Sequence, residues 1–210
     1  MRARKLALLA IPVVIAAALI LPGFLDQAAV PPPTKTLVGD AVWSPGSHPA
    51  PNFALPNWHG GTFHLDALRG RVVLLTFMDS LCRTDCPVEA SELHLMQRHL
   101  GKRLTPVIVI VSTDPAGDTS ANIRKFAAKF HLSAPFEWLT GSQAELAKVW
   151  RKYGIEVTGA STHSSAIYLI DRWGDEREGW GIPFPVTVFD RSVRVLMARY
   201  STGWRWPWNL

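Results

Sequence analysis

Apolar runs separated by amphipathic stretches fill the middle of the chain and predict strands alternating with helices. Residues 71–77 and 106–112 are short runs rich in valine, leucine and isoleucine, which is typical of buried strands. Residues 165–170 form a third such run, and a turn is expected at 171–174. Residues 52–65 favour a hairpin, because two short apolar arms flank a turn that contains two glycines.

Apolar residues recur at helical spacing in the stretches between these strands. They predict three helices, over 88–100, 119–131 and 142–153. Ser142 and Glu145 form a capping box at the start of the third helix. This order of elements indicates an α/β domain, in which helices cover both faces of a central mixed sheet with parallel members.

The start of the chain predicts a membrane anchor. Residues 6–25 carry no charge and are about long enough to cross a bilayer as a helix. Residues 1–5 hold three cations, which places them in the cytoplasm and the rest of the chain on the periplasmic or another extracytoplasmic side. A cleaved signal peptide is the alternative. Asp26 and Gln27 stand where a cleavage site needs small residues, which favours an uncleaved single-pass anchor, and no cysteine follows that could carry a lipid.

The rest of the chain divides by composition. Residues 26–49 are rich in proline and predict an extended linker, and 50–200 are enough for one domain with its own core. The tryptophan-rich tail, 201–210, either packs on the domain or lies at a membrane interface. The formal net charge of +5 comes from the ends, since 1–25 contribute +3 and 191–210 contribute +4. The middle is slightly acidic, so nucleic acid is not an expected partner.

The chain has two cysteines, Cys82 and Cys86, between the strand 71–77 and the helix 88–100. Cysteines directly after the first core strand are typical of a thioredoxin-like domain. Such a pair either cycles between dithiol and disulfide or binds one soft metal ion. A structural disulfide is the usual role outside the cytoplasm, but a bridge across three residues closes a very small loop and stabilises little. We therefore expect a reactive pair, whose thiolates the helix N-terminus and Arg83 should favour.

Several sequence blocks, taken in order, resemble the SCO/SenC family of membrane-anchored copper chaperones, which have thioredoxin-like folds. The blocks are 53–55, 68–77, Cys82-x-x-x-Cys86-Pro87, 112–119, 139–141 and His163-Ser164 shortly before 167–171. The resemblance implies that Cys82, Cys86 and His163 bind a copper ion. It also implies an acceptor for that copper, namely the copper-bearing subunit of a cytochrome c oxidase.

The same three residues suit copper on chemical grounds. Thiolates are soft donors for Cu(I), and imidazole is acceptable to it. His163 would reach the two sulfurs if the strand 165–170 lies beside the strand 71–77. We expect a membrane-tethered protein that passes copper to an acceptor by ligand exchange, or that reduces the acceptor's disulfide so that the acceptor can take copper.

Three other functions are open. A thiol–disulfide oxidoreductase would use Cys82 as nucleophile and Cys86 as resolving thiol, without a physiological metal. A peroxidase of the peroxiredoxin type ranks lower, because it needs a threonine where this chain has Asp79. A structural interaction domain would keep the two cysteines permanently oxidised.

The remaining polar candidates are expected to have ordinary roles. Two aspartates should cap loops, two histidines should lie on a helix surface, and three histidines before the core could hold at most a secondary metal. These residues are Asp114 and Asp118, then His94 and His99, then His48, His59 and His64.

Overall fold

Six strands form one mixed sheet in the computed structural model, which describes residues 37–133, 136–159 and 162–198. Their order across the sheet is β1, β10, β9, β4, β5, β6. Strands β4, β5 and β6 run parallel, whereas β9, β10 and β1 pair antiparallel with their neighbours. The bounds are β1 Ala41–Val42, β4 Val73–Met78, β5 Val107–Ser112, β6 Phe136–Leu139, β9 Ile167–Ile170 and β10 Glu176–Trp180.

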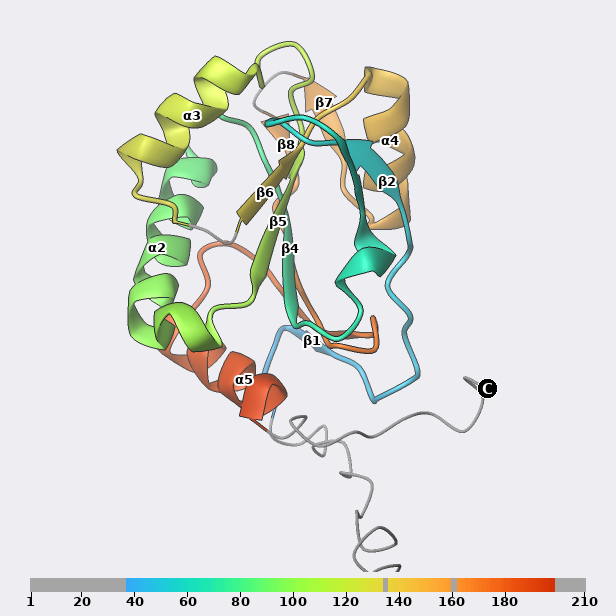
Figure 1. The fold of residues 1–210 in the computed structure, drawn as a ribbon, viewed down its shortest axis with the longest axis vertical. Helices are drawn as coiled ribbons and strands as arrows, with labels where there is room; N and C mark the ends of the chain where they lie inside the picture. Colours follow the sequence, from blue (N-terminus) through green and yellow to red (C-terminus); the bar gives the residue numbers. More distant parts are fainter. Residues whose placement is uncertain (1–36, 134–135, 160–161, 199–210) are drawn as a thin grey trace, which may run out of the picture. The chain divides into compact units, whose positions relative to one another are not determined.

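Helices cover both faces of this sheet, with α2, α3 and α5 on one side and α4 on the other (Figure 1). Two small hairpins, β2–β3 and β7–β8, and one 3₁₀ turn, η2, complete the described elements. The helices are α2 Asp85–Leu104, α3 Ser120–Lys129, α4 Gln143–Lys152 and α5 Val186–Ala198. The remaining elements are β2 Ala54–Pro56, β3 Thr62–His64, η2 Leu65–Leu68, β7 Val157–Gly159 and β8 Thr162–His163.

Strand β4 lies at the centre of the core, and all six of its residues are therefore buried. Val73, Leu75 and Phe77 pack with apolar residues of α4 and of the β2–β3 hairpin. Alternate residues of a strand point to opposite faces, so Leu74, Thr76 and Met78 face α2 and its neighbours. A strand buried on both faces is the physical reason for the continuous apolar run in the sequence.

The sequence predicted these central elements correctly. The hairpin, the strands β4, β5 and β9, and the three helices are all present close to their expected bounds. The capping box of Ser142 and Glu145 opens α4 as expected. One detail differs, since α2 begins at Asp85, before the expected Val88. The side chain of Thr119 caps the start of α3.

The expected linker 26–49 requires a correction. Leu37 is 4% exposed, and Ala41–Val42 pair with β10 as the edge strand of the sheet. Residues 37–49, the described part of that linker, therefore belong to the folded domain. Proline content predicted an extended and free spacer, whereas the described segment contains a short strand and a turn at 45–48 and is packed on the domain.

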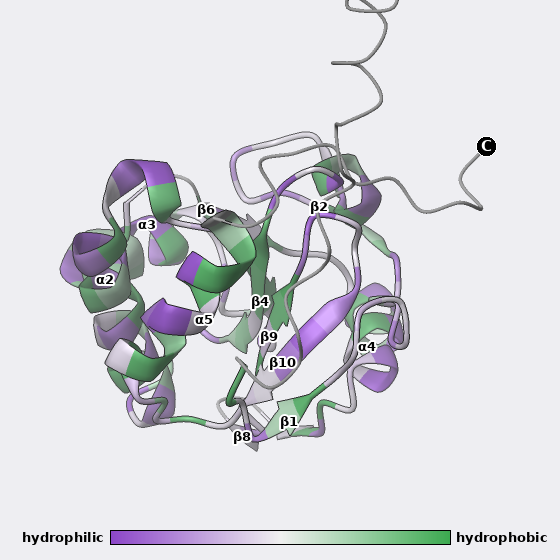
Figure 2. Ribbon diagram, turned by 90° about the horizontal axis from the view of Figure 1, so that it is seen from below, coloured by the Kyte–Doolittle hydropathy of each residue, from purple (hydrophilic) through white to green (hydrophobic). Residues whose placement is uncertain are grey.

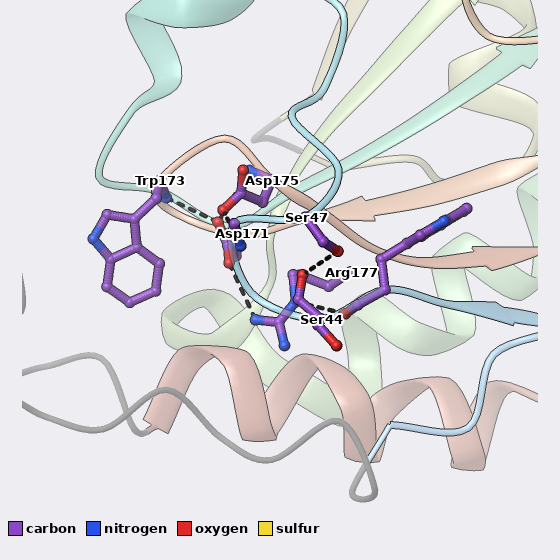
Figure 3. A network of polar contacts seen from close by, with 8 residues as sticks. Ser44, Ser47, Asp171, Trp173, Asp175 and Arg177 are labelled. Carbon is purple, nitrogen blue, oxygen red and sulfur yellow. Dashed lines mark hydrogen bonds and ion pairs between the residues drawn. The ribbon is translucent and has the colours of Figure 1, made fainter. Parts of the chain in front are cut away.

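A buried ion pair holds this segment to the sheet (Figure 3). Nη1 of Arg177 lies 3.2 Å from Oδ2 of Asp171, and both side chains are 0% exposed. Nε of Arg177 donates a hydrogen bond to the backbone carbonyl of Trp43 at 3.2 Å. The other carboxylate oxygen of Asp171 accepts backbone N–H groups from Trp173 and Asp175. The β9–β10 turn and the N-terminal segment are thus joined through one guanidinium group.

Strand β10 was not predicted, because its sequence is charged. Figure 2 draws β10 largely hydrophilic, whereas β4 is hydrophobic. Glu176, Arg177 and Glu178 are nevertheless all buried, with partners supplied by other elements. Helix α5 was also not predicted.

Within the described ranges, no helix is both long enough and apolar enough to cross a membrane. The expected anchor 6–25 and the expected tail 201–210 lie outside the described residues.

Candidate functional site

The loop 79–84 connects β4 to α2 and carries the first cysteine. Cys82 lies on this loop, and Cys86 lies in the first turn of α2, because the helix begins at Asp85. Both thiols are free, and the residues are 7% and 1% exposed, respectively. The backbone N–H of Asp79 points at the sulfur of Cys86, at 3.4 Å. The pair therefore sits at the carboxyl end of the central strand, partly shielded from water.

His163 lies on the chain segment that leads into β9, the strand next to β4, and it contacts Cys86. Strand β9 pairs antiparallel with β4, with Thr76 opposite Ile167, so the residues just before β9 lie at the carboxyl end of β4. Nε2 of His163 lies 3.7 Å from Sγ of Cys86. The expected neighbourhood of the two strands is thus confirmed, although His163 belongs to the small β7–β8 hairpin rather than to β9.

The ring of His163 is oriented by its own backbone. Its Nδ1 lies 3.0 Å from the carbonyl oxygen of Ser164. A carbonyl oxygen can only accept, so Nδ1 carries a proton, and in the neutral ring Nε2 keeps its lone pair. That lone pair is available to the thiol of Cys86 or to a metal ion.

Cys82 lies beside Cys86, with which it shares a hydrogen bond, and beside Thr84. Its sulfur is 3.4 Å from the hydroxyl oxygen of Thr84. Of the residues that the structure describes, no three His, Cys, Asp or Glu side chains lie close enough together to hold an ion as they stand. Cys86 thus contacts both Cys82 and His163, and the three donors would have to adjust to meet at one ion.

The two thiols differ in acidity. Burial disfavours the thiolate of Cys82, but hydrogen bonds from the side chain and backbone of Thr84, together with those from Cys86, outweigh burial, so the pKa of Cys82 is lowered. Burial raises the pKa of Cys86 far above that of an ordinary thiol, even though Asp79 donates a backbone hydrogen bond to it. The expectation that the helix N-terminus would favour both thiolates was therefore wrong for Cys86, where desolvation is the larger effect.

Asp118 fixes the loop that carries Cys82. Its Oδ1 accepts the backbone N–H of Ser80 at 2.8 Å, and its Oδ2 accepts the indole N–H of Trp138 at 3.2 Å. Burial raises the pKa of Asp118 to about 6. Within the loop, Oδ1 of Asp79 accepts the backbone N–H of Leu81 at 2.6 Å. The sequence suggested a loop-capping role for Asp118, but nothing in it indicated which loop is held.

A buried glutamate lies one turn after Cys86 on α2. Glu89 is 0% exposed, and its carboxyl group accepts a hydrogen bond from the hydroxyl of Thr76 on β4. Burial raises the pKa of Glu89 to about 8. No sequence signal indicates that this residue is buried, since glutamates on helices are usually exposed.

The other histidines do not add to this site. His48 lies 3.4 Å from Glu176, and His59 lies 3.0 Å from Glu137, so the two histidines that precede the core pair with different carboxylates. His99 lies 2.8 Å from Asp190 of α5.

Apolar side chains are exposed beside the thiols. Leu81, which precedes Cys82, is 48% exposed, and Val88, in the first turns of α2, is 45% exposed.

Comparison with known proteins gives consistent matches. A family model described as SCO1/SenC matches residues 44–178. A SCO1 protein homolog of Bacillus subtilis is 31% identical over 111 residues, which are 51% of this chain and 58% of that protein. The chain thus matches little more than half the length of that relative.

Solved structures show the same fold. Arabidopsis thaliana ScoI with copper bound superposes with a TM-score of 0.62 at 24% identity, covering 70% of this chain and 96% of that one. BsSco superposes with a TM-score of 0.63 at 24% identity, covering 76% of this chain and 99% of that one. Its structure is described as identifying a disulfide switch in a member of the Sco family of cytochrome c oxidase assembly proteins. The expected mixed sheet of a thioredoxin-like fold is confirmed. The chain belongs to the SCO1/SenC family.

Proposed function

We propose that this protein carries Cu(I) and delivers it to the copper centre of a respiratory oxidase. The observation that carries the proposal is the contact between Cys86 Sγ and His163 Nε2 at 3.7 Å, with Nδ1 of His163 engaged by a carbonyl. A thiolate and an imidazole lone pair facing each other suit a soft ion such as Cu(I). Copper-bound relatives of the same fold support this choice of cargo.

Cys82 supplies the third donor in this proposal. Its lowered pKa makes it the better thiolate, it already lies beside Cys86, and its place on the loop lets its side chain turn away from Thr84 toward His163. Cys86 then loses its proton as the ion binds, because metal ligation requires the thiolate. Release follows the reverse order, as donors of the acceptor replace Cys82 on the loop first, and Cys86 in α2 and His163 afterwards.

The acceptor is proposed to be the copper-bearing subunit of cytochrome c oxidase. The support is family membership together with the assembly role named for BsSco. We further propose that residues 6–25 tether the domain on the extracytoplasmic side, near membrane-bound targets.

Thiol–disulfide exchange with the acceptor is the second candidate function. The unequal acidity of Cys82 and Cys86 favours it, since the nucleophile of such a pair is the more acidic thiol. The Cys82 thiolate attacks the acceptor's disulfide, and one acceptor thiolate leaves. Cys86 then displaces the second acceptor sulfur and transfers its proton to a leaving thiolate. The acceptor gains two electrons as a dithiol, and Cys82 and Cys86 become a disulfide.

Titration with Cu(I) tests the proposal. The reduced full chain is titrated with Cu(I) against a competing chelator, and one equivalent is expected to bind per chain. The variant C82S/C86S should lose that equivalent, because both sulfur donors are removed. Stoichiometric binding of unchanged affinity in C82S/C86S would refute copper carriage by this pair.

A reduction assay separates the two functions. If exchange were the main activity, the H163A variant would reduce a protein disulfide as fast as the parent chain, and neither would bind Cu(I). The control is H64A, because His64 is exposed on β3.

A further inference from the structure

Two histidines that are distant in sequence face each other away from the thiols. His94 lies on α2, and His131 follows directly after α3. Their ring centroids are 5.5 Å apart, with an angle of 47° between the ring planes. His94 lies eight residues after Cys86 on the same helix, which is about 12 Å along its axis. The pair is thus separate from the candidate copper site.

The hydrogen bond of His94 engages Nδ1 and leaves Nε2 as the acceptor atom of the ring. Its Nδ1 lies 3.0 Å from the backbone carbonyl oxygen of His131. A carbonyl can only accept, so Nδ1 is the donor, and in the neutral ring Nε2 keeps its lone pair. His163 has the same arrangement with the carbonyl of Ser164. This is the usual orientation of a histidine that ligates a metal through Nε2.

The backbone of His131 is in an uncommon conformation. Its φ is +54°, and His131 has the only positive φ among the non-glycine residues that the structure describes. It stands just after the last turn of α3, where the N–H of Leu132 closes back on Ala127 at 2.9 Å. Glycine is the usual residue at that position, because other residues are strained there by roughly 1 kcal/mol. A strained histidine whose side chain is exposed is not explained by packing.

A side-chain clamp fixes the segment of His131 against α2. Nε2 of Gln97 donates to the carbonyl of Ser133 at 2.6 Å, and Oε1 of Gln97 accepts the N–H of Ser133 at 3.2 Å. Gln97 lies on α2, one turn after His94. The two imidazoles are therefore held close together by the fold before any ion arrives.

We propose that His94 and His131 form a second metal site, which takes a divalent transition ion, with Cu(II) preferred. Two imidazoles at neighbouring positions of one ion have centroids about 4.5 Å apart at the 90° angles of a tetragonal Cu(II) site and about 5 Å apart at tetrahedral angles, given metal–nitrogen distances of about 2.0–2.1 Å. The observed separation is 5.5 Å, so a small rotation of the exposed ring of His131 would bring the two rings to that spacing. Imidazole suits Cu(II) and Zn(II), and Cu(II) binds most tightly in the usual order of affinities. No third protein ligand is gathered here among the described residues, so water would complete the coordination.

Cu(II) binding to the full chain carrying C82S/C86S tests this site, because the thiol pair then cannot contribute. We expect one tightest equivalent of Cu(II), whose electron paramagnetic resonance spectrum shows coupling to two imidazole nitrogens. H94A and H131G should each lower the affinity at least tenfold. H131G is the sharper variant, because glycine accepts the left-handed backbone and the fold should keep or gain stability.

The control is H64A, which removes an exposed histidine of β3 and should leave the affinity of the tightest Cu(II) equivalent unchanged. The proposal is overturned if H131G and H94A, folded as judged by circular dichroism, bind Cu(II) as tightly as the C82S/C86S parent. Because the thiols are absent throughout, this outcome would leave the proposed Cu(I) function untouched.

Discussion

The sulfur of Cys86 and Nε2 of His163 lie 3.7 Å apart, although 77 positions separate the two residues in the sequence. The antiparallel pairing of β9 with β4 creates this contact, since it returns the chain to the carboxyl end of the central strand. The carbonyl of Ser164 then turns the lone pair of His163 toward the sulfur. The sheet therefore gathers the donors, and local hydrogen bonds orient them.

Thr84 should control the reactivity of Cys82. Its side chain and backbone hydrogen bonds lower the pKa of Cys82 against the opposing effect of burial. T84A removes the side-chain bond, so the pKa of Cys82 should rise and the thiol should be alkylated more slowly near neutral pH. The measurement is the pH profile of alkylation by iodoacetamide. T62A, at an exposed position of β3, serves as control, and an unshifted profile in T84A would contradict this role.

Glu89 should make stability fall as pH rises. Its pKa is raised by burial to about 8, from 4.5, so the folded state holds this proton after the unfolded state has lost it. Stability therefore decreases between about pH 4.5 and 8, by on the order of a few kcal/mol, and levels off above that range. E89Q keeps an acceptor for Thr76 without the charge, so it should be more stable than the parent at pH 8.

Denaturant unfolding of the reduced chain at pH 5 and pH 8 measures this effect. The exposed position Glu156 provides the matched control, because E156Q should retain the slope of the parent. A slope in E89Q as steep as that of the parent would show that another group causes the pH dependence.

Replacing only one partner of the ion pair between Arg177 and Asp171 should strongly lower the free energy of unfolding. Both groups are fully buried, so R177M leaves the Asp171 carboxylate buried without that cation. The expected loss is about 3–5 kcal/mol in the free energy of unfolding. The double variant D171N/R177M should lose less than the sum of the two single variants, which a double-mutant cycle measures. Additive losses would mean that the two side chains are not coupled.

The central sheet could be predicted from the sequence because its strands are buried on both faces. Continuous apolar runs marked β4 and β5, and the capping box marked the start of α4. Strand β10 could not be predicted in this way, since its charged residues are satisfied by backbone groups that are distant in sequence, such as those of Val38 and Trp43. Edge strand β1 is only two residues long, too short for a periodic signal.

The candidate site was predictable only in part. Cys82 and Cys86 are recognisable by their spacing, and His163 by the order of the sequence blocks. The supporting carboxylates of Asp118 and Glu89 could not be recognised from the sequence. Their contacts with Ser80 and with Thr76 depend on tertiary structure. The same holds for His94, which was expected on a helix surface and instead faces His131.

X-ray absorption at the copper edge of the Cu(I)-loaded full chain tests the central claim most directly. The account predicts two sulfur scatterers and one nitrogen scatterer in the parent, and loss of the nitrogen in H163A with both sulfurs kept. A parent spectrum without nitrogen, or one that H163A leaves unchanged, would contradict shared coordination by Cys82, Cys86 and His163.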